Sequence, residues 1–162
     1  MITGILLPDS GEVKRGEGLQ IGYYTQELED INLDKTLFDV IQEDSKLDES
    51  RVRSFLGRFM FAGSKAFQKI SSLSGGEKTR LCIARLLLQN YNFLILDEPT
   101  TYLDVLSQRI ILEALKEYKG TMVVVSHTEE FIDELRPQKV LFLPLGKFDF
   151  YKTEFLEKVN EV

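Results

Sequence analysis

Long apolar runs are missing from this sequence, and a membrane-spanning helix would need roughly 18 such residues. The longest runs, such as 122–125 and 140–143, have the length of buried strands. The segment 1–8 is apolar but has neither a basic flank nor a small-residue cleavage site, so we do not interpret it as a signal peptide. We therefore expect a cytoplasmic chain with no direct membrane insertion.

Cysteine is also scarce, and basic residues are outnumbered by acidic ones. Cys82 is the single cysteine, which excludes an internal disulfide, and its place in a helical apolar pattern favours packing over reactivity. The 20 Lys and Arg are outnumbered by 26 Asp and Glu, which gives a net charge of −6 and argues against wrapping nucleic acid by bulk electrostatics. With 162 residues, 43% of them hydrophobic, the chain can form one globular domain with a core.

The most informative absence is a phosphate-binding loop of the form G-x-x-x-x-G-K-[ST]. The stretch Gly76-Glu77-Lys78-Thr79 comes near it, but its Lys does not directly follow Gly. The backbone N–H groups and the Lys that cradle nucleotide phosphates in such a loop are therefore not supplied by this sequence.

The hydrophobic pattern predicts an α/β fold. Two short segments bounded by turn residues, 11–15 and 19–25, predict a strand pair or meander, and 35–61 predicts two short helices with Thr36 and Asp48 as N-caps. Further on, helix and strand patterns alternate, which predicts a parallel sheet covered on both faces. The predicted elements are helices at 74–90, 105–118 and 129–135, strands at 93–96, 121–125 and 140–143, and a peripheral tail from 144 with a short helix ending near 159.

Two adjacent acids, Asp97 and Glu98, follow the apolar strand 93–96 at its carboxyl end, where open parallel sheets bind ligands. One of them can hold Mg²⁺ directly or through water, while its neighbour orients or deprotonates an attacking water. The alternative is a strand end with solvated acids, which is common in proteins of every class.

A second candidate site is the helix start Ser74-Gly75-Gly76-Glu77. Free backbone N–H groups and the helix dipole favour a phosphate there, and glycine allows close approach of the backbone. An ordinary Ser-capped helix is the other interpretation.

Three further residues lie where a ligand is expected. His127, the only histidine, follows the strand 121–125 and can bond a terminal phosphate or the attacking water, although a solitary histidine is usually structural. Gln26 directly follows the second predicted strand and can contact the metal or the water, while Asp104 can serve as a helix N-cap, as an interface residue or as both.

Together these motifs resemble ATP-binding cassette (ABC) domains over about 11–143. The segment 73–77 resembles the ABC signature, 93–98 the Walker B strand, 101–104 the D-loop, Ser126-His127 the switch histidine and Gln26 the Q-loop. The resemblance implies ATP and Mg²⁺ as cofactors, with Glu98 and His127 catalytic, Asp97 and Gln26 at the metal, and Gln26, Ser74, Gly75, Gly76, Glu77 and Asp104 at the nucleotide. It also implies a P-loop NTPase-like cassette at 1–143, with a small antiparallel β part, a helical subdomain at about 35–90 and a peripheral tail at 144–162.

The subtype resembles the ABC-F class, whose members act at the ribosome, because 77–81, 97–100 and Phe131 follow its style. Two departures concern the local contacts of the D-loop and the histidine, since Thr101 stands where the class has Asn, and Thr128-Glu129 stand where it has Asp-Arg. In addition, 1–8 resembles the end of the helix that follows Walker A, so we expect the sequence to begin just after the phosphate loop.

In this family two cassettes bind ATP head to tail, so the resemblance implies a second cassette, in cis or in trans, as a partner. Without the loop we expect little or no ATPase activity from the chain alone. The alternatives are a transporter cassette, the carboxyl lobe of a DNA-organising ATPase of the SMC type, and a non-catalytic module that lends its signature to a partner.

Overall fold

The computed structural model describes residues 2–4, 6–24, 31–143 and 146–153. The helices of this part are α1 (Leu37–Asp44), α2 (Glu49–Arg58), α3 (Gly75–Leu88), α4 (Val105–Glu117) and α5 (Glu129–Leu135), with short 3₁₀ turns η1 (Gly63–Phe67) and η2 (Ile70–Ser72). The strands are β1 (Ile21–Tyr24), β2 (Phe93–Asp97), β3 (Thr121–Val125), β4 (Lys139–Phe142) and β5 (Lys147–Phe150). The α/β class predicted from the sequence is therefore confirmed.

A three-stranded parallel sheet lies at the centre, in the order β1-β2-β3. In the register of this sheet, Tyr24 of β1 is aligned with Leu96 of β2, and Asp97 of β2 is aligned with Val125 of β3. Helix α4 connects β2 to β3, as parallel neighbours require a crossover. All three strands therefore end at the same edge of the sheet, which is where Asp97 stands.

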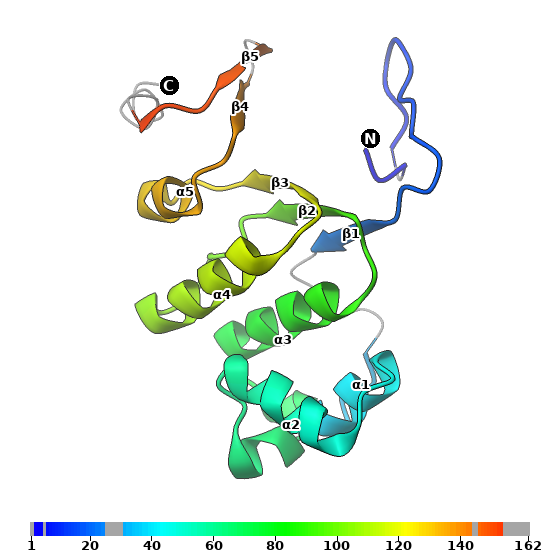
Figure 1. Ribbon diagram of the computed structural model, residues 1–162, viewed down its shortest axis with the longest axis vertical. Coiled ribbons are helices and arrows are strands. Elements are labelled where there is room, and N and C mark those ends of the chain that lie inside the picture. The colour runs from blue at the N-terminus through cyan, green and yellow to red at the C-terminus, as the bar shows by residue number, and fades with distance from the viewer. Residues whose placement is uncertain (1, 5, 25–30, 144–145, 154–162) are drawn as a thin grey trace.

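Helices α3 and α4 lie on one side of this sheet (Figure 1). They bury a cluster of side chains with the alternate strand residues that point toward them, Tyr24, Leu94 and Leu96. A second cluster fills the helical part formed by α1, α2, η1 and η2, and includes Leu37, Ile41, Val52, Leu56, Phe59, Phe61 and Ile70. The predicted N-caps Thr36 and Asp48 both accept a hydrogen bond from the first turn of their helices.

Helix α3 belongs to both clusters. Leu81 and Ala84 are buried in the helical part, whereas Ile83 is buried against the sheet. Because these residues lie on different faces of one helix, α3 is held from two sides and its N-terminus has a fixed position relative to the sheet.

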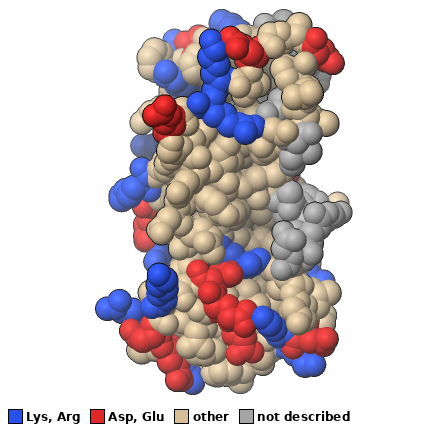
Figure 2. Space-filling view, turned by 90° about the vertical axis from the view of Figure 1, so that its right-hand side faces the viewer, with Lys and Arg blue, Asp and Glu red and all other residues tan. Residues whose placement is uncertain are grey.

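The sequence predicted that helices cover both faces of the sheet, and for the part of the chain described this prediction is wrong. The helices pack on one face, and on the other Tyr23, Val123 and Val125 are 38%, 37% and 48% exposed. The apolar run of β3 predicted two buried faces, but its side chains alternate between the helices and solvent. On the side of the molecule shown in Figure 2, the centre of the view is largely without Lys, Arg, Asp or Glu, which lie toward the two ends and along the left edge.

Two strand predictions are also corrected. Residues 11–15 form no strand and are exposed, and β1 pairs in parallel with β2 instead of with a preceding strand. The strand predicted at 140–143 is β4, which pairs antiparallel with β5 rather than joining the parallel sheet. The small antiparallel part therefore lies near the carboxyl end, and includes residues that we expected in a peripheral tail. The helix predicted to end near 159 lies outside the described residues.

Candidate functional site

The acidic pair stands at the end of the central strand. Asp97 is the last residue of β2 and is exposed, while Glu98 follows with φ of +48°, a left-handed conformation that is uncommon for a residue other than glycine. The backbone N–H of Glu98 donates to the carbonyl of Val125 at 2.9 Å, which ties the strained residue to the neighbouring strand. The turn therefore directs two adjacent carboxylates differently, and such strain is concentrated at functional sites.

His127 approaches Glu98 from the end of β3. Its Nε2 lies 3.7 Å from Oε1 of Glu98, and its own side chain is 85% exposed. Oε1 of Glu98 is itself buried and accepts no hydrogen bond within the part of the chain described. A carboxylate oxygen without a donor inside the protein can accept a proton or a hydrogen bond from a bound molecule.

Two threonines hold the segments that carry these residues. The hydroxyls of Thr100 and Thr128 are 3.2 Å apart, and Thr100 is almost fully buried. The backbone N–H of Thr128 also donates to Oγ of Ser126 at 3.1 Å. Thr128 departs from the ABC-F pattern, and here it joins the turn after Glu98 to the turn after β3. This contact could not be predicted from the sequence, because two hydroxyls far apart in the chain form no recognisable pattern.

The donor chemistry at this edge fits Mg²⁺, which proteins often bind through one or two carboxylates while phosphates and water complete the shell. Asp97 offers an exposed carboxylate at a strand end. No group of three or more His, Cys, Asp or Glu side chains within the described ranges could hold a metal alone. A cation at Asp97 would therefore depend on a bound phosphate for further ligands. Gln26, the other predicted metal residue, lies outside the described residues.

The start of α3 is closed by a capping box. Oγ of Ser74 accepts from the backbone N–H of Glu77 at 3.3 Å, and the Glu77 carboxylate accepts from the backbone N–H of Ser74 at 3.0 Å. The latter bond is the main reason that the pKa of Glu77 lies below its usual value, and Lys65 at 3.3 Å adds to it. Gly75 has open space around its Cα, so the first turn is accessible at that position.

The signature turn contacts the segment before Asp104. A Cβ on Gly76 would stand 3.3 Å from Cδ2 of Leu103 and 3.6 Å from the carbonyl oxygen of Tyr102, so glycine permits this close approach. Asp104 caps α4, because its carboxylate accepts from the backbone N–H and the hydroxyl of Ser107, both at 2.9 Å. These bonds hold the pKa of Asp104 below its usual value. The capping role predicted for Asp104 is therefore confirmed.

The structure thus forms two groups of predicted residues. Asp97, Glu98 and His127 gather at the carboxyl edge of the sheet, and Ser74–Glu77 lie with Asp104 at the joined starts of α3 and α4. Within the described part of the chain, no hydrogen bond or ion pair joins one group to the other. The strand that precedes Gln26 contacts helix α3 one residue beyond Lys78, since the hydroxyl of Tyr24 donates to Oγ1 of Thr79 at 3.3 Å.

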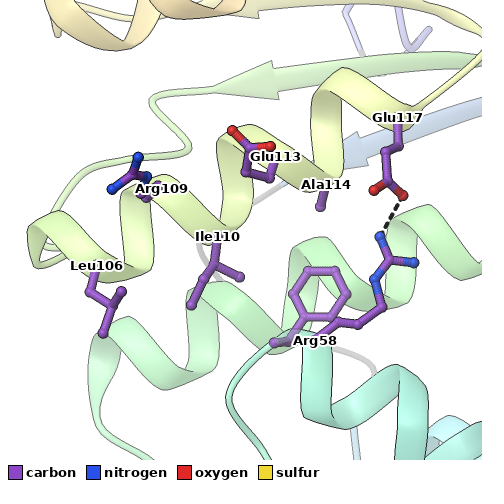
Figure 3. Close-up of a pocket in the computed structure, with 8 residues that line it drawn as sticks. Arg58, Leu106, Arg109, Ile110, Glu113, Ala114 and Glu117 are labelled. Atoms are coloured by element: carbon purple, nitrogen blue, oxygen red, sulfur yellow. Dashed lines mark hydrogen bonds and ion pairs between the residues drawn. The ribbon is translucent and has the colours of Figure 1, made fainter.

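An open groove of about 350 Å³ lies elsewhere, between α2 and α4 (Figure 3). None of the predicted site residues lines it. Arg58 and Glu117 form an ion pair of 2.5 Å at one end of it, while Leu106 and Ile110 supply apolar lining. The predicted nucleotide residues are therefore found at element ends on the surface and not in this groove.

Strand-end acids with a histidine beside them, and a glycine-rich helix start next to a second loop, are the features that the sequence predicted for a bipartite nucleotide site. The sequence model of the family described as ABC transporter matches residues 1–101. The chain belongs to this family and is an ABC ATPase nucleotide-binding domain. No helix within the described residues is long and apolar enough to cross a membrane.

Two curated relatives illustrate the similarity. The chain is 41% identical to a Bacillus subtilis protein named YdiF, over 96% of this chain and 26% of the relative. It is 36% identical to the ATP-binding protein Uup of Haemophilus influenzae, over 97% of this chain and 25% of that protein. These relatives are ATP-binding proteins of the ABC-F type, and the chain spans about a quarter of their length.

Solved structures share the fold. RNase-L inhibitor superposes with a TM-score of 0.67 at 26% identity, over 83% of this chain and 27% of that one. A dimeric ATP-binding cassette in a post-hydrolysis state, bound to ADP and Pi, superposes with a TM-score of 0.63 at 24% identity, over 83% and 64% of the two chains. The predicted cassette fold is therefore confirmed.

Proposed function

We propose that this chain is the signature-bearing and acid-bearing part of an ABC-F ATPase that works in the cytoplasm at the ribosome. Ser74, Gly75, Gly76 and Glu77 contact the phosphates of an ATP held by a second cassette, with Asp104 beside them. Asp97, Glu98 and His127 serve a second ATP, together with Gln26. ATP binding and hydrolysis at this pair of sites drive a conformational change in the whole protein.

The observation that carries this proposal is the 3.7 Å approach of His127 to Glu98 at the ends of neighbouring parallel strands. Glu98 offers an oxygen that has no hydrogen-bond donor among the described residues, which suits a residue that orients or deprotonates water. His127 is exposed and can turn its imidazole toward a terminal phosphate. Asp97 would hold Mg²⁺, which neutralises charge on the phosphates when bound.

The signature group supports the partner in this proposal. The capping box leaves the Gly75 side of the first turn open, and the helix N-terminus attracts an anion there. The solved cassette that shares this fold is a dimer with ADP and Pi, as its description states. The sequence has no G-x-x-x-x-G-K-[ST] loop, so the cradling of the phosphates beside Asp97 is assigned to no residue of this chain.

The first test is nucleotide-dependent association. The purified chain is mixed with an ABC cassette that contains the phosphate loop, and the mass of the complex is measured by light scattering with Mg²⁺ and ATP, ADP or no nucleotide. We expect a one-to-one complex with ATP alone. Absence of any nucleotide-dependent complex would contradict the proposal.

Gly75→Ala is the variant that tests the signature contact. A Cβ at this position meets nothing within 4 Å in the chain, so the fold should tolerate it while the approach of a phosphate is obstructed. Gly57→Ala in α2 is the matched control, because a Cβ there also meets nothing. We expect Gly75→Ala to weaken the complex and Gly57→Ala to leave it unchanged; equal effects would count against a phosphate contact.

The ribosomal partner needs a separate measurement. In extracts of the source cells, we expect the native protein that carries this chain to sediment with ribosomes. Sedimentation with membranes would favour the transporter alternative instead.

A further inference from the structure

The least expected side chain in the structure is that of Arg80, which is only 6% exposed. Arg80 stands in the second turn of α3, directly behind the capping box of Ser74 and Glu77. A buried guanidinium is costly unless other groups pair with it, and its pairing shows what it is there to hold.

The partners of Arg80 come from three elements. Its Nη1 donates to Oγ of Ser107 in α4 at 2.7 Å, and that hydroxyl in turn donates to the carboxylate of Asp104 at 2.9 Å. Its Nη2 lies 3.9 Å from Oε1 of Glu77, and its guanidinium lies 5.2 Å from the ring centre of Phe61. The Sδ of Met60 is a further, weak acceptor of Nη1 at 3.5 Å.

The guanidinium thus lies between the two acids that cap the neighbouring helices. Glu77 closes the start of α3 and Asp104 closes the start of α4, and Arg80 faces the first directly and the second through Ser107. Lys65 also faces Glu77 at 3.3 Å, but from the surface. Among the described residues, only Arg80 contacts the caps of both helices, through a buried hydrogen bond to Ser107 on one side and an ion pair of 3.9 Å with Glu77 on the other.

We propose that Arg80 is a positioning residue that fixes the phosphate-facing start of α3 against the Asp104 turn, so that both are presented to a bound nucleotide as one rigid unit. The proposal rests on the proposed function for its consequence in ATP binding. The rigid link itself is independent of ATP, and the two are therefore measured separately.

The variants isolate this link. Arg80→Met removes the charge and the donors and keeps much of the volume, and Ser107→Ala removes only the bridging hydroxyl. Arg85→Met is the matched control, because Arg85 lies in the same helix and pairs with Asp44, away from Asp104. Urea unfolding of each variant defines conditions under which all of them are folded.

Amide hydrogen exchange of the full chain without nucleotide is the first readout. We expect Arg80→Met and Ser107→Ala to speed exchange at 104–108 about tenfold, with Arg80→Met also loosening 75–79, while Arg85→Met leaves both segments unchanged. Equal effects of Arg80→Met and Arg85→Met on these segments would overturn the proposal. Ser107→Ala decides the matter if Arg80→Met does not fold, since unchanged exchange at 104–108 would also overturn it.

Association with the loop-containing cassette in Mg²⁺ and ATP is the second readout. Misplacement of groups around a ligand is costly even when the substitution is remote, so we expect Arg80→Met to weaken the complex by at least about tenfold, against less than about twofold for Arg85→Met. If the unaltered chain forms no complex, the proposed function fails while the exchange data still decide the role of Arg80. If a complex forms and the two variants weaken it equally, the positioning role is wrong.

Discussion

The two groups of site residues differ in how far the chain itself holds them in place. Ser74 and Glu77 cap the start of α3 reciprocally, Asp104 caps the start of α4 through Ser107, and the buried Arg80 lies between the two starts. At the edge of the sheet, Asp97 and His127 are exposed, and Oε1 of Glu98 accepts no hydrogen bond from any residue that the structure describes. The first group is therefore preorganised by internal contacts, whereas the second leaves its polar atoms available to a ligand.

The largest expected effect concerns the open group. In this chain joined to the phosphate-loop segment of an ABC cassette, Glu98→Gln should lower the rate of ATP hydrolysis by about 10²- to 10⁴-fold, because a general base is lost. A steady-state phosphate-release assay measures it. Glu130→Gln, an exposed acid in α5, is the control and should keep the rate. Similar rates for both variants would remove Glu98 from the chemistry.

Loss of a cap should affect the preorganised group through stability. Ser74→Ala removes the acceptor for the Glu77 backbone N–H and should lower the free energy of unfolding by about 1 kcal/mol. Urea denaturation measures this change. Ser71→Ala is the control, since Ser71 is exposed and its side chain lies outside the capping box; a change of equal size there would show that the cap contributes nothing specific.

The hydrogen bond between the two turns at the open edge should contribute less to the free energy of unfolding than the cap does. We expect Thr100→Val and Thr128→Val to couple in a double-mutant cycle by about 0.5–1 kcal/mol, because their hydroxyls share a hydrogen bond. The free energies of unfolding of the two single variants and the double variant give the coupling. If the two changes in unfolding free energy are strictly additive, the contact between Thr100 and Thr128 contributes nothing to stability.

The smallest effect is a pH dependence of the preorganised group. Because the pKa of Glu77 is lowered in the folded chain, its stabilising contribution is present above its ordinary value of 4.5 and is lost as the pH falls through the lowered pKa. The difference in unfolding free energy between the unaltered chain and Glu77→Gln should therefore shrink between about pH 6 and pH 3, by less than about 1 kcal/mol. A difference that grows on acidification would contradict the assigned direction.

Local signals predicted much of this architecture. Thr36, Asp48 and Ser74 were recognisable as caps because each precedes an apolar pattern of helical period, and their caps are formed. Asp97 and Glu98 were recognisable because two adjacent acids directly follow an apolar strand, at the carboxyl end where open parallel sheets bind ligands. Such features depend on neighbours in the chain, which a sequence displays directly.

The errors concern contacts between distant segments. Residues 11–15 resemble a strand but do not form one, and β1 pairs with β2 instead. Likewise, β4 pairs with β5 because the two are joined by a short turn, while the alternation of helices and strands favoured a place in the parallel sheet. The burial of Arg80 escaped prediction because its partner Ser107 comes from another helix, and charged helix residues are usually exposed.

The double attachment of α3 has a consequence for the way the domain melts. With Leu81 in one apolar cluster and Ile83 in the other, neither cluster can lose its contacts without exposing a face of the helix that the other needs. On heating, both parts should therefore unfold in a single cooperative transition, and no intermediate with an unfolded helical part and an intact sheet should accumulate.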